Sequence, residues 1–189
     1  MENNKIQNAA VMHAPGAEGM KIRNEPGFPM QEGAAEGYRD ERPLKVLTFT
    51  VGDSTYGIEL ELVTEIVGIQ PITEVPEVPA AVKGIMNLRG RIVPVIDIRS
   101  KFGWEEAPYH DRTCIVILEV RDQVVGLIVE AVSEVVAIPR REILQPPGFH
   151  ANAQDSYIKG IVRIGDQIKM ILDCNRLLDL DEMDMGIVQ

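Results

Sequence analysis

The residues that could carry catalysis do not form a recognisable catalytic set in this sequence. The chain has three histidines and two cysteines among 189 residues. Neither cysteine stands in a motif with a histidine, which argues against a thiol nucleophile. The strings typical of serine hydrolases, zinc peptidases and phosphate-binding loops are missing. We therefore expect no catalytic site, and we keep an enzyme using Asp97 or His150 in a cleft as the less favoured alternative.

The other histidines and both cysteines have simple interpretations. His13 stands in a polar N-terminal segment, and His110 precedes an aspartate in a loop, a pattern typical of a surface turn. Cys114 and Cys174 lie in apolar runs, so we expect buried thiols in a reducing compartment. Neither cysteine has partners at metal-ligand spacing, and the sequence predicts neither a metal nor a cofactor.

The chain is acidic, with 29 Asp and Glu against 19 Lys and Arg and a formal net charge of −10. Such a charge makes nucleic acid and anionic membrane surfaces poor partners. Most carboxylates are interpreted as solvating charges. Asp97 and Asp173 occupy matching places in two halves of the chain, which favours a shared structural role, such as helix capping, over catalysis.

Two charged residues stand out from this background. Glu65 is an acidic residue among apolar ones, and Arg89 stands at the expected tip of a hairpin beside Gly90. They could be ordinary surface charges, or they could form a polar binding patch with apolar neighbours, to which an exposed arginine is suited. The residues alone favour neither interpretation.

The elements that must position these residues are predicted to be strands. Leucine, isoleucine and valine dominate the apolar residues, and aromatics make up only 5%. Alternating segments separated by short turns predict hairpins. The expected hairpins are 47–60 around Gly52-Asp53, 84–98 around Arg89-Gly90-Arg91, 116–129 around Arg121-Asp122-Gln123, and 161–172 around Gly165-Asp166.

The remaining segments are less regular. Residues 61–68 are too short to distinguish helix from strand, and Pro94 marks its strand as an edge or bulged strand. Residues 175–183 predict a short acidic helix. Residues 1–43 are rich in glycine, proline and charge, so we expect a disordered tail. We see neither a signal peptide nor an apolar run long enough to span a bilayer, and expect a cytoplasmic protein.

The ordered part contains an internal repeat. At an offset of 69 residues Asp53, Gly57, Val63 and Glu65 match residues of the second half, and at an offset of 76 the segment 83–85 and Asp97 do so. Two halves of about five short strands each predict two small β-barrels, because closure removes exposed sheet edges. The expected boundaries are 1–43 for the tail, 44–105 and 106–180 for the halves, and 181–189 for a C-terminal tail, with strand exchange between halves left open.

Residues 83–103 read KGIMNLRGRIVPVIDIRSKFG, which resembles the signature stretch of the CheW family. Three further segments resemble other family blocks in the same order: TFTVGDSTYGIELELVTEIV, VVGLIVEAVSEVVAIP and YIKGIVRIGDQIKMILDCNRLL. The resemblance covers about residues 44–180. It implies an all-β fold with short helices, built from two tandem five-stranded SH3-like barrels.

The resemblance also implies a function and a site. Members of the family are non-enzymatic adaptors without cofactors that couple methyl-accepting chemoreceptors to the histidine kinase CheA. They bind the regulatory domain of the kinase and the helical cytoplasmic tip of the receptors, and are recruited to membrane-associated arrays. The residues that match positions tied to coupling form one expected surface: Glu65, Arg89, Val63, Gly84, Gly126 and Val135.

An adaptor of another chemosensory system, such as pilus motility, is the alternative within the family. The 43-residue tail is longer than the family pattern needs. The sequence contains neither a receiver domain, as in CheV, nor a kinase ATP site, as in CheA itself.

Overall fold

The computed structural model describes residues 42–146 and 153–178. Nearly all of the expected tail 1–43, the C-terminal tail 181–189 and His150 lie outside the described residues. The described part is mostly β, as the sequence predicted. Its elements are β1 (Leu44–Val51), β2 (Ser54–Glu59), η1 (Leu60–Leu62), β3 (Val63–Gly68), β4 (Val82–Leu88), β5 (Arg91–Asp97), α1 (Ile98–Lys101), β6 (Cys114–Val120), β7 (Gln123–Val129), β8 (Ala131–Ile138), η2 (Arg140–Glu142), η3 (Ala153–Tyr157), β9 (Ile158–Ile164), β10 (Gln167–Leu172) and α2 (Cys174–Leu177).

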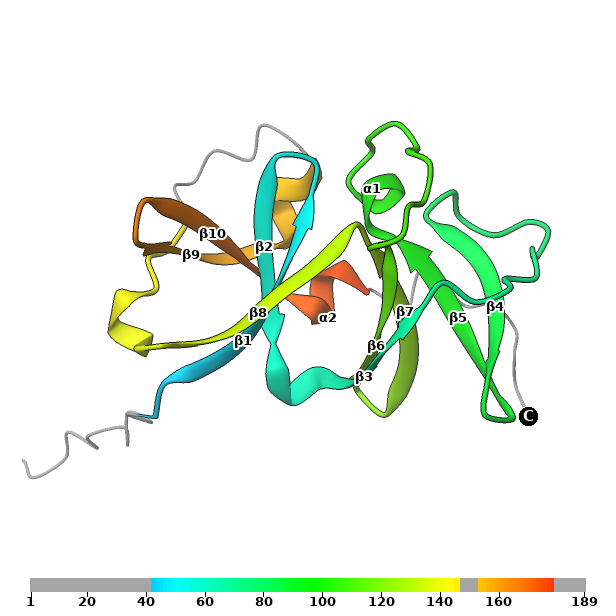
Figure 1. The fold of residues 1–189 in the computed structure, drawn as a ribbon, viewed down its shortest axis with the longest axis horizontal. Helices are drawn as coiled ribbons and strands as arrows, with labels where there is room; N and C mark the ends of the chain where they lie inside the picture. Colours follow the sequence, from blue (N-terminus) through cyan, green and yellow to red (C-terminus); the bar gives the residue numbers. More distant parts are fainter. Residues whose placement is uncertain (1–41, 147–152, 179–189) are drawn as a thin grey trace, which may run out of the picture. The chain divides into compact units, whose positions relative to one another are not determined.

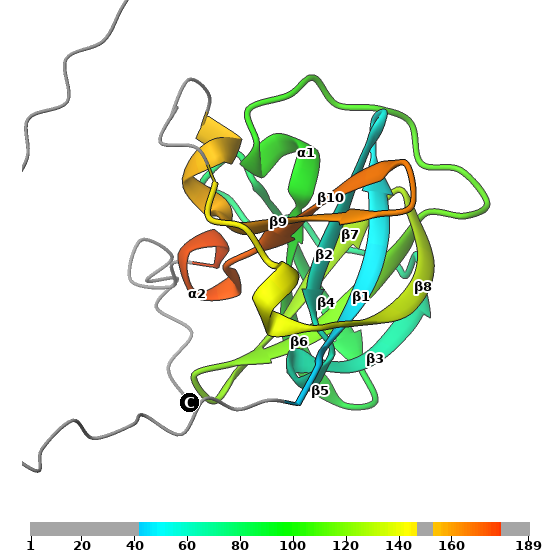
Figure 2. The same cartoon turned by 90° about the vertical axis from the view of Figure 1, so that its left-hand side faces the viewer.

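The strands form two five-stranded sheets (Figure 1). In sheet A the strand order is β8-β1-β2-β10-β9, so β1 lies between β2 and β8 (Figure 2). In sheet B the order is β3-β6-β7-β5-β4. The two orders correspond strand for strand under the internal repeat, because β1 corresponds to β6, β2 to β7, β3 to β8, β4 to β9 and β5 to β10.

The two sheets do not coincide with the expected halves 44–105 and 106–180, because each sheet contains strands from both halves. Sheet A joins β1 and β2 of the first repeat to β8, β9 and β10 of the second, and sheet B combines the remaining strands. Strand exchange, which the sequence analysis left open, is therefore the arrangement of the fold. The chain passes between the sheets at η1 and again at Glu130, the single residue between β7 and β8. These crossings are short because β2 and β7 end beside the opposite sheet.

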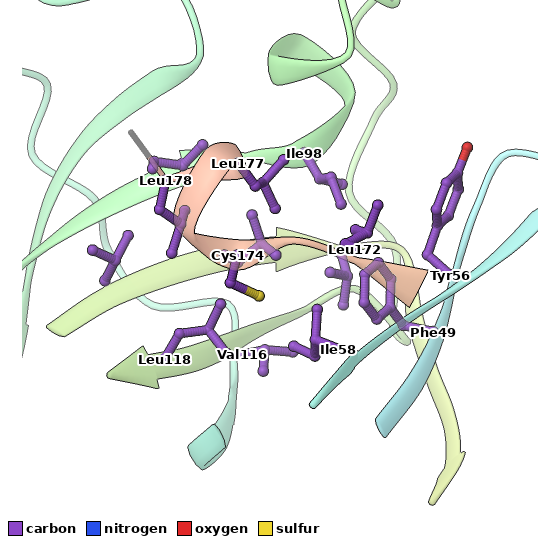
Figure 3. Packing of buried hydrophobic residues seen from close by; sticks show 14 of the residues in the cluster. Phe49, Tyr56, Ile58, Ile98, Val116, Leu118, Leu172, Cys174, Leu177 and Leu178 are labelled. Carbon is purple, nitrogen blue, oxygen red and sulfur yellow. The ribbon is translucent and has the colours of Figure 1, made fainter. Parts of the chain in front are cut away.

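The largest hydrophobic cluster is shared by both sheets (Figure 3). Phe49 and Ile58 come from sheet A, Val116 and Leu118 from sheet B, and all four are fully buried. The helix α2 adds buried residues, including Leu177, to the same cluster. Burying one such aliphatic side chain contributes about 1.5–3 kcal/mol, so this cluster is a main source of adhesion between the sheets.

Matching aspartates begin the two short α-helices. The side chain of Asp97 accepts hydrogen bonds from the backbone N–H groups of Arg99 and Ser100 at the start of α1. Asp173 accepts two equivalent bonds at the start of α2. A carboxylate satisfies backbone donors that have no partner in the first turn of a helix. The predicted capping role is confirmed at both positions.

Pro94 occupies a position of β5 where a missing N–H costs nothing. Its partner across the antiparallel ladder is Ile85, whose own N–H and carbonyl bond to Thr73 instead. The parallel pairing of β5 with β7 begins only at Val95. The facing strand β4 also carries a register shift between Val82 and Gly84. The sequence predicted an edge or bulged strand at Pro94. The edge prediction is wrong, because β5 lies between β4 and β7 over its second half, and the register shift is on β4.

No helix of the described residues is long and apolar enough to cross a membrane. The two α-helices, α1 and α2, have four residues each.

Cys174 supplies a test of the shared core. Its side chain is buried, and burial raises the pKa of the thiol to about 12, with Lys159 acting in the opposite direction. Because the thiolate is the reactive form, we expect Cys174 to resist alkylation by iodoacetamide at pH 8 in the folded protein. Mass spectrometry should find it labelled at the unfolded rate only in denaturant. If Cys174 were labelled as fast in native buffer as in denaturant, its buried position would be contradicted. The labelling rate of the partly buried Cys114 in the same sample is the internal reference.

Candidate protein-binding site

Glu65 and Arg89 form an ion pair on sheet B. Nη2 of Arg89 donates to Oε2 of Glu65 over 2.8 Å. The Arg89 side chain is 79% exposed, whereas that of Glu65 is 26% exposed. The carboxylate is thus the anchored partner, and the guanidinium keeps most of its donors toward solvent. The sequence left open whether these residues are separate surface charges or parts of one polar patch. In the structure their side chains are in contact.

The two residues come from opposite edges of the same sheet. Glu65 lies on β3, which pairs only with β6, and Arg89 occupies the turn after the other edge strand, β4. The turn is a two-residue hairpin loop with positive φ at both Arg89 (52°) and Gly90 (88°), the geometry that matches the twist of the flanking strands. The side-chain oxygen of Asn87 accepts from the N–H of Gly90 over 2.7 Å and holds the loop.

A small hollow lies beside the ion pair. Apolar side chains, among them Val93, Ile117 and Val124, line it together with charged ones that include Glu65 and Arg89. Outside the hollow, sheet B exposes large apolar side chains, with Ile66 44% and Ile92 55% accessible. Sequence reasoning did not select these two isoleucines.

Val63 and Val135 lie at different places. Val63 is partly buried at the start of β3 and packs against the shared core. Val135 is 50% exposed on β8, which belongs to sheet A. Only Val135 of these two therefore offers a largely accessible side chain.

Gly84 and Gly126 are buried and lie in one row across sheet B. Each pairs with Val95, Gly84 through the β4–β5 ladder and Gly126 through the parallel β5–β7 ladder. A Cβ at Gly84 would lie 2.1 Å from the carbonyl oxygen of Thr73, and a Cβ at Gly126 would lie 2.8 Å from Ile115. Gly84 therefore permits close approach of the β3–β4 connection at Thr73, and Gly126 permits close approach of β6.

The six residues expected on one coupling surface are thus not placed together. Glu65 and Arg89 are in contact, Val63 lies nearby on the same strand as Glu65, and Val135 is on the other sheet. The two glycines are inside sheet B because they allow strands to pack, so any effect on a partner would be transmitted through the fold. The motif match did not distinguish surface positions from packing positions.

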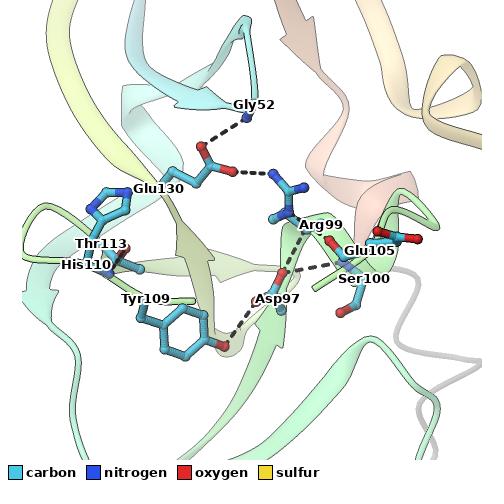
Figure 4. A network of polar contacts seen from close by, with 9 residues as sticks. All are labelled: Gly52, Asp97, Arg99, Ser100, Glu105, Tyr109, His110, Thr113 and Glu130. Carbon is cyan, nitrogen blue, oxygen red and sulfur yellow. Dashed lines mark hydrogen bonds and ion pairs between the residues drawn. The ribbon is translucent and has the colours of Figure 1, made fainter. Parts of the chain in front are cut away.

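The alternative of a catalytic Asp97 receives no support from its surroundings. The carboxylate caps α1 and also accepts from the hydroxyl of Tyr109 over 3.0 Å (Figure 4). Burial, followed by the charge of Asp97, raises the pKa of Tyr109, which therefore remains a donor. Within the described ranges, no group of three or more His, Cys, Asp or Glu residues could hold a metal ion.

Comparison with known proteins identifies the relatives of this fold. A family model described as the CheW-like domain matches residues 45–182. The chain belongs to the CheW-like family. It is 35% identical over 137 residues to the chemotaxis protein CheW of Klebsiella aerogenes, covering 72% of this chain and 82% of that protein. It is 32% identical over 148 residues to CheW of Treponema pallidum, covering 76% and 87%.

A solved structure agrees with this membership. The crystal structure of the scaffolding protein TtCheW from Thermoanaerobacter tengcongensis matches with a TM-score of 0.68 at 34% sequence identity, and the match covers 74% of this chain and 95% of that one. The predicted CheW-like fold, with two tandem SH3-like units, is confirmed. The CheW-like family is one of non-enzymatic adaptors, and membership gives this chain the role of a chemotaxis coupling adaptor.

The packing of the family's KG motif can be tested at Gly84. Replacing it by alanine places a methyl group against the backbone at Thr73, at a φ of 137° that alanine rarely adopts. We expect Gly84→Ala to lower the free energy of unfolding by about 2–4 kcal/mol, measured by urea denaturation. Gly68→Ala, where the added methyl meets nothing within 4 Å, is the matched control. Equal stability of the two variants would show that the strand approach is not restrictive.

The ion pair is expected to add little to stability. An exposed pair contributes at most about 1 kcal/mol, so Arg89→Gln and Glu65→Gln should unfold cooperatively within that margin of the wild type. Thermal unfolding followed by circular dichroism measures this. The control is Arg163→Gln, which removes another exposed pair, Arg163–Asp166. Loss of the cooperative transition in either site variant would make the pair a structural element instead.

Proposed function

We propose that this adaptor couples the histidine kinase CheA to methyl-accepting chemoreceptors through the surface around Glu65 and Arg89, without catalysis of its own. The single observation that carries the proposal is the Arg89–Glu65 pair on an exposed hairpin tip beside a hollow that has both apolar and charged lining residues. The residue types at these places match family positions tied to coupling. The proposed partners are the regulatory domain of the kinase and the helical cytoplasmic tip of the receptor.

The physical case rests on preorganisation. Glu65 is largely buried and holds one nitrogen of Arg89, so the guanidinium loses less side-chain freedom when a partner binds. Its remaining donors face solvent and suit a carboxylate or a row of carbonyl groups. Ile66 and Ile92 supply exposed apolar area, and hot spots in interfaces commonly combine an arginine with apolar contacts.

Val135 supports a second contact region on sheet A. Its exposed side chain on β8 can meet the apolar face of a helix, which is the form of a receptor tip. Val63 lies at the start of β3 and sets the position of the strand that carries Glu65. We propose that Gly84 and Gly126 act through the shape of sheet B, since both are buried.

The same chemistry disfavours other partners. A net charge of −10 opposes binding to nucleic acid or insertion at anionic lipid. Recruitment to membrane-associated receptor arrays in the cytoplasm would therefore run through protein contacts, in which apolar and hydrogen-bonding groups carry the affinity.

The test is a binding measurement with the full chain. Isothermal titration against the kinase regulatory domain and, separately, against a receptor tip fragment compares wild type with Arg89→Gln, Glu65→Gln and Val135→Ser. We expect Arg89→Gln to weaken binding to at least one partner by about tenfold or more, as for a hot-spot residue, while the fold persists. The difference between the two titrations assigns each residue to kinase or receptor.

Arg163→Gln is the matched control, because it removes an exposed arginine of the same charge from the β9–β10 hairpin of sheet A. If Arg89→Gln and Arg163→Gln bind equally well, the proposed site is wrong. If the wild type binds neither partner, the adaptor serves another chemosensory system, and the proposal fails as a whole.

A further inference from the structure

A polar cluster joins the two sheets where the chain crosses between them. Glu130 is the crossing residue itself, placed between the last residue of β7 in sheet B and the first of β8 in sheet A. Its Oε1 accepts from Nη1 of Arg99 over 2.5 Å, and its Oε2 accepts from the backbone N–H of Gly52 over 3.0 Å (Figure 4). Gly52 forms the β1–β2 turn of sheet A, and Arg99 lies in α1 after β5 of sheet B. One carboxylate therefore bonds to both sheets.

Arg99 is held in place from several directions. Its Nε donates to the carbonyl of Glu105 over 2.9 Å, and its guanidinium lies 5.6 Å from the centre of the Trp104 ring. A Cβ built on Gly52 would lie 3.3 Å from the same ring, so Trp104 also reaches the β1–β2 turn. The side chains of Arg99 and Glu130 are only 22% and 25% exposed. Partial burial and charge-assisted hydrogen bonds make this contact stronger than a surface ion pair.

The other crossing between the sheets is built differently. Under the repeat offsets of 69 and 76, Gly52 corresponds to Arg121, Arg99 to Asn175 and Glu130 to Glu61. There, Nε of Arg121 donates to the side-chain oxygen of Asn175 over 3.2 Å in an exposed hydrogen bond. Glu61 is exposed at η1. The charged cluster thus breaks the approximate symmetry of the fold, because only the crossing at Glu130 carries a partly buried ion pair among the described residues.

The shared hydrophobic core does not replace such a cluster. Apolar burial holds the sheets together, but the hydrophobic effect is non-directional and specifies their relative angle only through packing. Hydrogen bonds have preferred distances and angles, so a carboxylate that bonds to both sheets restricts rotation of one sheet against the other. The rotation matters because Glu65 and Arg89 lie on sheet B while Val135 lies on sheet A.

We infer that Glu130 and Arg99 are positioning residues that fix the angle between sheet A and sheet B, and with it the relative placement of the two partner-contacting faces. The placement of the sheets is a property of the free chain. Its consequence for partners rests on the proposed function. The two can therefore be tested apart.

The experiment measures sheet orientation in the full-length chain without any partner. Residual dipolar couplings of backbone N–H groups give an alignment tensor for the strands of each sheet. We expect one tensor to fit both sheets in the wild type. In Glu130→Ala and Arg99→Gln the two tensors should diverge beyond error, and the exchange rate of the Gly52 amide in Glu130→Ala should rise by roughly tenfold or more.

Glu130→Gln keeps an acceptor for Gly52 but loses the charge that pairs with Arg99, so its effect should be intermediate. Arg121→Gln removes the contact at the other crossing and is the matched control, for which one tensor should still fit both sheets. If a single tensor fits both sheets in every variant, the inference is overturned, even where the melting temperature falls, because the residues would then add stability without setting orientation.

The same variants separate this inference from the proposed function. Should Arg89→Gln leave kinase and receptor binding intact while the tensors of Glu130→Ala diverge, the coupling site is wrong and the positioning role stands. Should binding depend on Arg89 while the tensors remain common, the coupling site stands and the positioning role is wrong.

Discussion

Neither repeat of this chain completes a sheet with its own strands, and every other feature depends on that constraint. The β1–β2 hairpin continues only through pairing with β8 on one side and with β10 on the other, both from the second repeat. In the same way β6 and β7 are flanked by β3 and β5 of the first. Unpaired backbone groups at strand edges are costly when buried, so each half supplies what the other lacks. The common core, the crossing at Glu130 and the split of exposed residues over two sheets all follow.

Local pattern was enough to predict the pieces of this fold. Alternating residues and turn residues located the hairpins, and matched aspartates predicted the caps that Asp97 and Asp173 provide. The exchange of strands could not be obtained in this way, because β3 and β8 have the same alternation whichever sheet they join. Pairing between distant strands is decided by the whole core, which a local pattern does not contain. Residues 61–68 remained ambiguous for a related reason, since they change from η1 to β3 at the crossing.

The residues of the candidate site were selected by their match to the family motif. Their chemical types alone did not distinguish a binding site from ordinary surface charges. The sequence marked Glu65 and Arg89 as unusual, and folding places their side chains 2.8 Å apart although the two residues belong to opposite edges of sheet B. The motif also selected Gly84 and Gly126, which are buried where a side chain would collide with the backbone at Thr73 and with Ile115 of β6, respectively. A matched motif reports that a residue matters without saying whether packing or contact is the reason. The cluster at Glu130 gave no sequence signal, since Glu130 and its two partners, Gly52 and Arg99, are far apart along the chain.

Strand exchange also constrains how the protein can be made. During synthesis the β1–β2 hairpin emerges from the ribosome early, but its partner β10 ends at Leu172, near the last described residue. All strands of sheet B have emerged once β7 ends at Val129, so sheet B can form first. At that stage the β1–β2 hairpin still lacks β8 and β10. Until β8 and β10 emerge, the edges of β1 and β2 lack their pairing partners, and unpaired strand edges make such chains prone to aggregation. Sheet A, which contains the first strand of the fold, thus also needs the last strand before it is complete.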